Sequence, residues 1–261
     1  MLAVLVIALI VKPTEVNALT GCPKSQTAPE AHTIILIDET DRLPPNELRF
    51  VKDLVITEYM WLPTYGRLTV RSLHSDPAEG EEIVICRVAE SSTTAGLLDN
   101  ERTIKKRFDA IAGERLSDLF RDLETAPQQE ASPIMEAVGM IFERTDFLPN
   151  VEARRLVVVS DLAQHSEAFT MYGRGQSLKP PEDLAEEFFQ NMSGVDVRLQ
   201  YVRRPGLRGL QGRDHRDFWE SYIGSQEPNS VAIGHGPLLG EASDRKTYLY
   251  SPPGGDAPAR R

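Results

Sequence analysis

Two short and almost wholly apolar segments constrain the fold of this chain more than any other feature. Residues 33–37 (TIILI) are followed by Asp38, and residues 156–160 (LVVVS) are followed by Asp161. Strands that are apolar on both sides are typical of a parallel sheet that helices cover on both faces. We therefore expect a buried central sheet in which each of these strands ends at an aspartate.

The segments between these runs favour alternating helices and strands. Apolar residues recur at helical spacing after the Pro44-Pro45 pair and again after Ser132-Pro133, where Ser132 is expected to cap the helix. Helices are expected at residues 45–62, 104–123, 134–142, 182–192 and 215–223, and further strands at residues 68–73, 83–88 and 195–202. This order predicts an α/β fold: a doubly wound, mainly parallel central sheet with helices on both faces.

The 261 residues are enough for one domain of ordinary size. We expect this domain at residues 31–240, after an N-terminal signal or anchor segment and linker at residues 1–30. Residues 241–261 are expected to form a flexible tail, because they end in a sequence rich in proline and glycine, SPPGGDAPARR.

An unbroken apolar run at residues 2–11 suggests where the domain is located. As a helix the run would extend about 15 Å, against about 30 Å for the hydrocarbon core of a bilayer, so it is too short to cross one. It fits an export signal or the last part of an anchor, and a buried strand is the alternative. We expect a domain at a bacterial inner membrane that faces the periplasm, or one secreted there.

The chain has two cysteines, Cys22 and Cys86, which are too few for a disulfide scaffold or a four-cysteine zinc site. In an oxidising compartment they can form one bridge, which would close a loop of about 64 residues and stabilise the domain by roughly 2–4 kcal/mol. Two unrelated buried thiols are the alternative. Residues 19–22 (LTGC) also resemble a bacterial lipobox, whose cysteine is lipidated, although charged residues interrupt the segment before it.

Polar oxygen ligands are expected to meet at one edge of the sheet. Asp38 and Asp161 follow two buried strands, Thr40 lies on the loop after Asp38, and Ser132 begins an intervening helix. In an open α/β sheet, ligands bind at the carboxyl ends of the strands, near the point where the strand order reverses. Two carboxylates and two hydroxyls form an oxygen-only site that suits Mg²⁺.

This pattern resembles the von Willebrand factor type A domain and its metal-ion-dependent adhesion site. The family motif is Asp-x-Ser-x-Ser after the first strand, a Thr from a later loop and an Asp after the fourth strand. Asp38 matches the first Asp, Thr40 takes the first Ser position, Ser132 resembles the Thr, and Asp161 resembles the last Asp. The second Ser position is Arg42, whose guanidinium cannot ligate a cation and, folded inward, would neutralise the two aspartates in its place.

The resemblance implies a non-catalytic protein-interaction module that binds a partner protein at this edge. Where a metal binds, Asp38, Thr40 and Ser132 would lie near Mg²⁺, Asp161 would act through water, and a carboxylate of the partner would complete the coordination. A degenerate, metal-free site would instead bind the partner through the loops around the same edge. Both versions stay open at this point.

Charge excludes some partners and suggests others. With 29 basic and 39 acidic residues the net charge is −10, which disfavours general nucleic-acid binding. Residues 202–216 nevertheless hold five arginines and one acid, a loop that could bind a phosphate, an acidic partner or anionic lipid headgroups, or could pair with the acidic surface. Candidate partner-binding residues are Arg42, His165, Arg203, Arg204, Arg208 and Arg213. His165 is otherwise expected to hydrogen-bond its own loop, and His215 and Trp219 to pack in the core.

Two other functions compete with the interaction module. A magnesium-dependent phosphohydrolase resembling the haloacid dehalogenase type would use Asp38 as its nucleophile, but Thr40 stands where a second acid is needed as proton donor. A scaffold subunit of an envelope assembly would use the fold alone, and then neither Asp38 nor Asp161 would matter beyond stability.

Overall fold

The computed structural model describes residues 14–25, 28–88, 97–173, 178, 186 and 188–235. The apolar run at residues 2–11, the tail at residues 241–261 and most of the helix expected at residues 182–192 lie outside the described residues. Residues 188–192, which are described, form no helix.

Within these residues six strands form one sheet, in the order β3-β2-β1-β4-β5-β6. Strand β3 is antiparallel to β2, and the other neighbouring strands are parallel. The strands are β1 (Ala31–Asp38), β2 (Arg67–Leu73), β3 (Glu82–Cys86), β4 (Ala153–Ser160), β5 (Val195–Tyr201) and β6 (Ser230–His235). Strand β6 was not predicted, because its six residues include a glycine and carry little apolar alternation.

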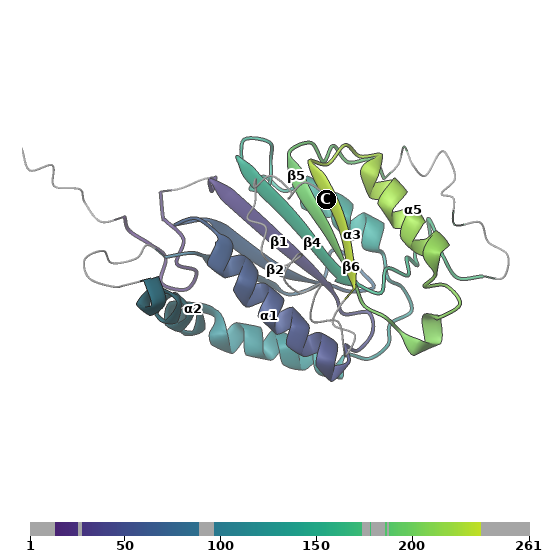
Figure 1. Cartoon of the computed structure of the whole chain (residues 1–261), viewed down its shortest axis with the longest axis horizontal. Coiled ribbons are helices and arrows are strands. Elements are labelled where there is room, and N and C mark those ends of the chain that lie inside the picture. Colours follow the sequence, from purple (N-terminus) through teal and green to yellow (C-terminus); the bar gives the residue numbers. More distant parts are fainter. Residues whose placement is uncertain are drawn as a thin grey trace, which may run out of the picture.

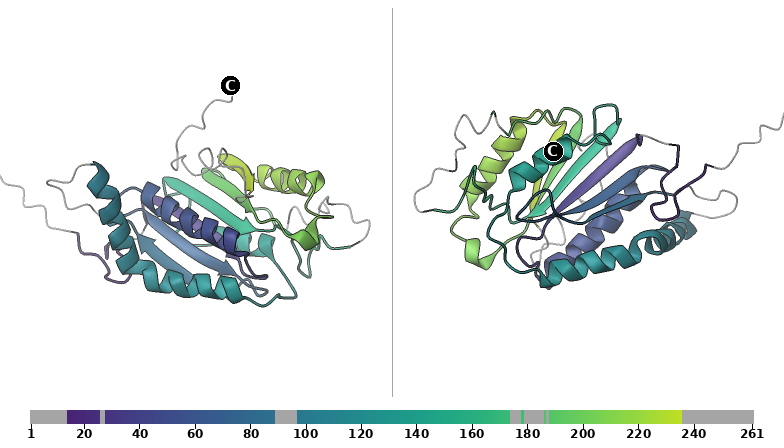
Figure 2. Two further views of the ribbon diagram at one scale, coloured as in Figure 1. Left: turned by 60° about the horizontal axis from the view of Figure 1, so that its bottom comes forward. Right: turned by 180° about the vertical axis from the view of Figure 1, so that it is seen from behind.

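Helices cover both faces of the sheet, as Figures 1 and 2 show. Helices α1 (Pro45–Trp61) and α2 (Leu97–Thr125) lie on one face, and α3 (Ile134–Phe142) and α5 (Arg213–Gly224) lie on the other. A single 3-10 turn, η1 (Pro205–Leu207), lies in the loop before α5. The doubly wound, mainly parallel α/β fold is therefore confirmed. No helix of the described part combines the length and hydrophobicity that crossing a bilayer requires.

Alternate residues of the central strands supply two separate cores. In β1, Ile35 and Ile37 pack on the side of α1 and α2, while Ile34 and Leu36 pack on the side of α3 and α5. All four are fully buried. This double burial is the physical reason why the apolar run of β1 shows no polar alternation.

A buried ion pair joins α1 to the sheet. Nη1 of Arg155 in β4 lies 3.1 Å from Oε2 of Glu58 in α1, and the two side chains are only 2% and 1% exposed. Arg198 of β5 lies 3.6 Å from the other oxygen of Glu58. Because a buried charge without a partner is costly, these contacts fix how α1 sits on β4 and β5.

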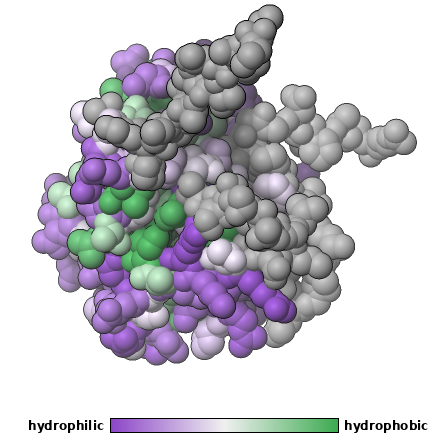
Figure 3. Space-filling view, turned by 90° about the vertical axis from the view of Figure 1, so that its left-hand side faces the viewer, coloured by the Kyte–Doolittle hydropathy of each residue, from purple (hydrophilic) through white to green (hydrophobic). Residues whose placement is uncertain are grey.

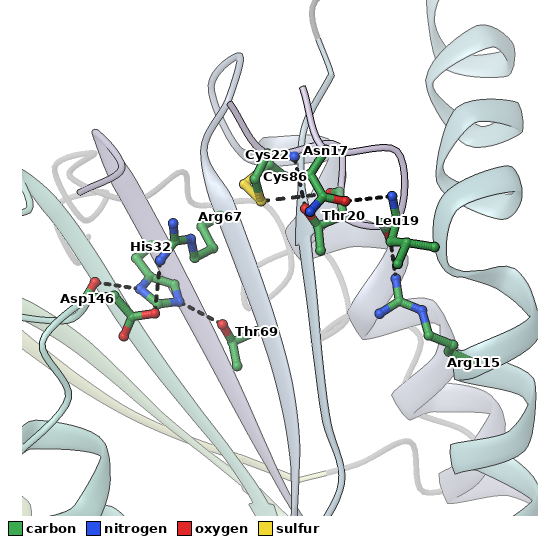
Figure 4. Close-up of a disulfide and its surroundings, with 10 residues drawn as sticks. All are labelled: Asn17, Leu19, Thr20, Cys22, His32, Arg67, Thr69, Cys86, Arg115 and Asp146. Carbon is green, nitrogen blue, oxygen red and sulfur yellow. Dashed lines mark hydrogen bonds and ion pairs between the residues drawn. A yellow bond between two sulfur atoms is a disulfide. The ribbon is translucent and has the colours of Figure 1, made fainter. Parts of the chain in front are cut away.

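A disulfide joins Cys22 to Cys86, which is one of the two alternatives that the sequence left open, and it leaves neither thiol free (Figure 4). Cys22 is therefore not lipidated in this form of the protein. Cys86 pairs with Arg67, the first residue of β2, so the bridge lies at the amino end of the parallel strands. Beside it, Gly21 has a φ of +70°, and a Cβ there would lie 3.0 Å from the carbonyl oxygen of Cys86.

The N-terminal segment at residues 14–25 also contacts the domain through its backbone. The carbonyl of Thr20 accepts a hydrogen bond from the N–H of Cys86 at 2.7 Å, and the carbonyl of Leu19 accepts one from Arg115 of α2 (Figure 4). The Leu19 side chain is 74% exposed. Figure 3 views this end of the molecule, whose coloured surface is mostly hydrophilic around a hydrophobic area.

Candidate functional site

The carboxyl edge of the sheet contains a topological switch point between β1 and β4. These strands are neighbours, and the chain continues from β1 to β2 on one side and from β4 to β5 on the other. Asp38 is the last residue of β1, and Asp161 directly follows β4. The structure therefore brings the two aspartates to the crevice at which open α/β sheets bind ligands.

Asp38 is the centre of a hydroxyl cluster. Its Oδ1 accepts hydrogen bonds from the backbone N–H of Thr40 at 3.0 Å and from the Thr40 hydroxyl at 2.6 Å. Its Oδ2 accepts from the hydroxyls of Ser132 at 3.2 Å and Ser160 at 2.6 Å. All four residues are buried. Ser132 thus serves the site and is not the helix cap that was expected: Pro133 takes the cap position, without a side-chain cap bond.

Sequence reasoning missed Ser160, whose place depends on the strand register. Ile37 and Val159 are register partners, so the next residues, Asp38 and Ser160, end neighbouring strands at the same level. The only signal in the sequence was a polar residue at the end of an apolar run. The register that puts it beside Asp38 cannot be read from one strand alone.

Helix α5 holds the loop that carries Asp161. The Leu162 carbonyl accepts hydrogen bonds from Nε2 of His215 at 2.9 Å and Nε1 of Trp219 at 2.8 Å. Since a carbonyl only accepts, Nε2 carries the proton, and Nδ1 of His215 accepts from the Tyr201 hydroxyl at 2.6 Å. Burial lowers the pKa of His215, which keeps the ring neutral. His215 and Trp219 are fully buried, which confirms their predicted place in the core.

The surroundings of Asp161 disfavour the charged form of its carboxyl group. Burial, together with the nearby charge of Asp38, raises the pKa of Asp161 to about 6. Two contacts favour its charged form: the N–H of Ala163 donates to Oδ1 at 2.9 Å, and Nε of Arg204 lies 3.5 Å from Oδ2. They do not offset burial and repulsion. The site therefore holds negative charge that its own side chains compensate only in part.

Arg204, and not Arg42, supplies the positive charge beside Asp161. The Arg204 guanidinium donates to the backbone carbonyls of Asp41 and Arg42, and its Nε lies 3.7 Å from Oδ2 of Asp41. Arg42 is exposed, so the inward arrangement considered for it in the sequence analysis does not occur in the structure. Arg204 comes from the loop after β5, beside β4, and its side chain is only 12% exposed. It connects the loop after β1 to Asp161.

His165 and Tyr172 border the same edge. His165 pairs with Ser132 through two backbone hydrogen bonds of 2.8 and 2.9 Å, and its Nδ1 lies 2.8 Å from the Thr170 hydroxyl. This confirms that His165 bonds its own loop and shows that it also holds Ser132. The ring of Tyr172 packs against His165 edge-on, with centroids 5.3 Å apart. Burial and the charges of Asp161 and Asp38 raise the pKa of Tyr172 to about 12, although the residue is 44% exposed.

The remaining basic candidates lie on the surface. Arg203 and Arg208 are exposed on the loop between β5 and α5, and Arg213 is exposed as the first residue of α5. These three side chains are exposed to solvent, whereas the Arg204 side chain points toward Asp41 and Asp161.

The donor set fits a hard divalent cation in its chemistry. Asp38, Thr40, Ser132, Ser160 and Asp161 present only oxygen atoms, and burial together with the nearby charge of Asp38 raises the pKa of Asp161. The described residues contain no cluster of three or more His, Cys, Asp or Glu side chains that could hold a metal. An ion at this edge would depend on hydroxyls and water, and it would compete with the Arg204 guanidinium.

Comparisons with known proteins find solved structures that are similar to this chain at low sequence identity. No family model and no curated protein matches it. An aerotolerance-related membrane protein from Bacteroides fragilis is similar at 12% identity and a TM-score of 0.41, over 83% of this chain and 95% of that one. A von Willebrand factor type A protein from Catenulispora acidiphila gives 12% and 0.42, over 84% and 41%. The pilus adhesin SpaC from Lactobacillus rhamnosus GG gives 9% and 0.45, over 80% and 28%.

The strand order and the meeting of Asp38 and Asp161 at the switch point are those expected of a von Willebrand factor type A-like fold.

Proposed function

We propose that this protein is a non-catalytic interaction module, held at or exported across a bacterial inner membrane, which binds a partner protein at the carboxyl edge of its sheet. The observation that carries the proposal is the polar cluster around Asp38 and Asp161 at the switch point. Four hydrogen bonds from the chain itself hold the Asp38 carboxylate in place at this edge. The exposed Tyr172 beside this cluster offers a partner an aromatic contact.

The module is proposed to bind Mg²⁺ through Asp38, Thr40 and Ser132, with Asp161 acting through water. When bound, the ion would supply a positive charge that a carboxylate of the partner can complete. The chain's own residues orient this set: Ser160 holds Asp38, and the backbone of His165 holds Ser132. Arg204 offsets part of the negative charge of Asp161 and so opposes the ion.

The metal part is tested by thermal unfolding with increasing Mg²⁺ against EDTA. A ligand that binds only the folded state raises the melting temperature with its concentration. We expect such a rise for the wild-type protein and a larger rise for Arg204→Gln, because the competing cation is then lost. If the melting temperature of both proteins does not change with Mg²⁺, only the metal-free form of the binding site remains.

The partner is tested by crosslinking the exported domain in cells and identifying what it captures. Tyr172→Ser is the main variant, because the side chain is 44% exposed at this edge. We expect one protein that the wild type captures to be lost with Tyr172→Ser and Asp38→Asn, and kept with the control Asp118→Asn on α2. Equal capture by all four proteins would mean that the partner does not bind at this edge of the sheet. Metal-dependent hydrolysis of a phosphate ester by the wild type, abolished in Asp38→Asn, would favour the phosphohydrolase.

A further inference from the structure

Exposed apolar side chains gather at the amino end of the parallel strands, which is the end opposite the polar cluster around Asp38. Six large apolar side chains are exposed in the part of the chain that the structure describes. Four of them belong to segments at this end: Leu19 (74% exposed), Trp61 (37%), Leu148 (41%) and Phe189 (51%). The other two are Met140 on α3 and Tyr172 at the carboxyl edge. Figure 3 views the amino end and shows a hydrophobic area among hydrophilic residues.

The order of the elements places each of the four residues at this end. Trp61 is the last residue of α1, directly before the turn that leads into β2. Leu148 lies in the loop that leads into β4, and Phe189 lies shortly before β5. Because these strands are parallel, the segments that enter them lie at the same end of the sheet. Leu19 is held there by the disulfide that follows it and by the hydrogen bond from Arg115 to its carbonyl.

The N-terminal segment is fixed to the same end along its whole described length. The N–H of Lys24 donates to the carbonyl of Glu15 at 2.9 Å, and the disulfide binds this closed segment to Cys86. Only two residues separate Thr14 from the apolar run at residues 2–11. Three residues of extended chain reach at most about 11 Å. A membrane that holds the apolar run must therefore lie close to the amino end of the domain.

The chemistry of this end fits a lipid bilayer with neutral headgroups. The run at residues 2–11 is too short to cross a bilayer, so its hold depends on the apolar area that enters the lipid, to which further side chains can add. Tryptophan is enriched at the boundary between lipid and water. Glu15 and Lys24, the only charged residues of the segment at residues 14–25, lie 3.6 Å apart and cancel, so this segment does not require an anionic surface.

We propose that the amino end of the domain rests on the membrane that holds the N-terminal segment, with Leu19, Trp61, Leu148 and Phe189 in contact with the lipid. This inference rests on the membrane location in the proposed function and adds which end of the domain meets the bilayer. Strand β1 extends roughly 26 Å over its eight residues, so Asp38 lies about that far from the lipid. The partner then binds at a carboxyl edge that faces away from the membrane.

The two tryptophans of the chain allow a direct test. Trp61 is partly exposed at the amino end, whereas Trp219 is fully buried in the core. The whole protein is bound to phosphatidylcholine vesicles with and without brominated acyl chains, because bromine quenches tryptophan fluorescence only at short range. We expect bromine to lower the emission of the wild type. The Trp61→Phe protein, which emits from Trp219 alone, should not be quenched.

A matched control moves the same fluorophore to the other end of the domain. In the Trp61→Phe protein, the further change Tyr172→Trp places an exposed tryptophan at the carboxyl edge, and its emission should not respond to bromine. A second variant tests the contact without fluorescence. Leu19→Ser should lower the partition of the protein into vesicles about tenfold, because a leucine side chain favours apolar surroundings by at least that factor.

Two results would overturn the inference while leaving the membrane location intact. The protein binds the vesicles but the emission of Trp61 does not respond to bromine, or the tryptophan at position 172 is quenched as strongly as Trp61. The proposed function fails in a different way. If the whole protein does not bind the vesicles at all, its membrane location and this inference both fall, and partner binding at the carboxyl edge still depends on the crosslinking result.

Discussion

Replacing Asp161 by asparagine should make the protein more stable at neutral pH, although it removes a residue of the proposed site. The carboxyl of Asp161 has a pKa of about 6 in the folded protein against an ordinary 3.8, because it is buried beside Asp38. One unit of pKa corresponds to about 1.4 kcal/mol, so the ionised form costs the folded state about 3 kcal/mol. Asparagine has the shape of the neutral acid and avoids this cost.

The sign of the pH dependence follows from the raised pKa. The favourable contribution of protonated Asp161 is complete below pH 3.8 and is lost as the pH rises through 6. The advantage of Asp161→Asn should therefore be near zero at pH 3.5, grow between pH 4 and 6, and level off above pH 7 at about 3 kcal/mol. The backbone bond from Ala163 can persist, because asparagine keeps an oxygen that accepts it.

The assay is urea unfolding of both proteins at several values between pH 3.5 and 8, followed by circular dichroism. Asp118→Asn is the matched control, because that carboxylate is half exposed on α2 and pairs with Arg121. Its difference from the wild type should stay within about 0.5 kcal/mol at every pH. A constant difference between wild type and Asp161→Asn across this range, or a less stable variant at pH 8, would refute the electrostatic reasoning.

Three further changes probe the fold. Replacing both Cys22 and Cys86 by serine should lower the free energy of unfolding by about 2–4 kcal/mol, measured against the oxidised wild type, because the bridge spans 64 residues. Gly21→Ala should cost about 1–3 kcal/mol in the same assay, since its φ of +70° and the nearby Cys86 carbonyl leave no room for a Cβ. Glu58→Ala should cost about 3–5 kcal/mol, because it leaves Arg155 charged and buried without its closest partner; a loss below 1 kcal/mol would mean that water or Asp196 takes over.

The central strands could be predicted from the sequence because double burial leaves a distinctive pattern. The runs that end at Asp38 and Asp161 became β1 and β4, and the rule that parallel strands end at one edge placed the two aspartates together. This part of the site depends on chain order alone. It needs no knowledge of side-chain direction.

The charge balance of the site could not be predicted in the same way. Arg42 lies close to Asp38 in sequence, yet its side chain is exposed, and the compensating guanidinium comes from Arg204 on another loop. Which arginine points inward depends on loop packing at β5, which no local pattern encodes. Ser160 was missed for a related reason, since its contact with Asp38 depends on the register between two strands.

The position of the disulfide determines at which end of the domain the N-terminal segment lies. Cys86 lies at the amino end of the parallel strands, and Asp38 lies at the far end of β1, which extends roughly 26 Å over its eight residues. The described segment at residues 14–25 is thus fixed to the pole of the molecule opposite Asp161. Reduction of the bridge would free Cys22 at this pole and leave in place the hydrogen bonds around Asp38 at the opposite pole.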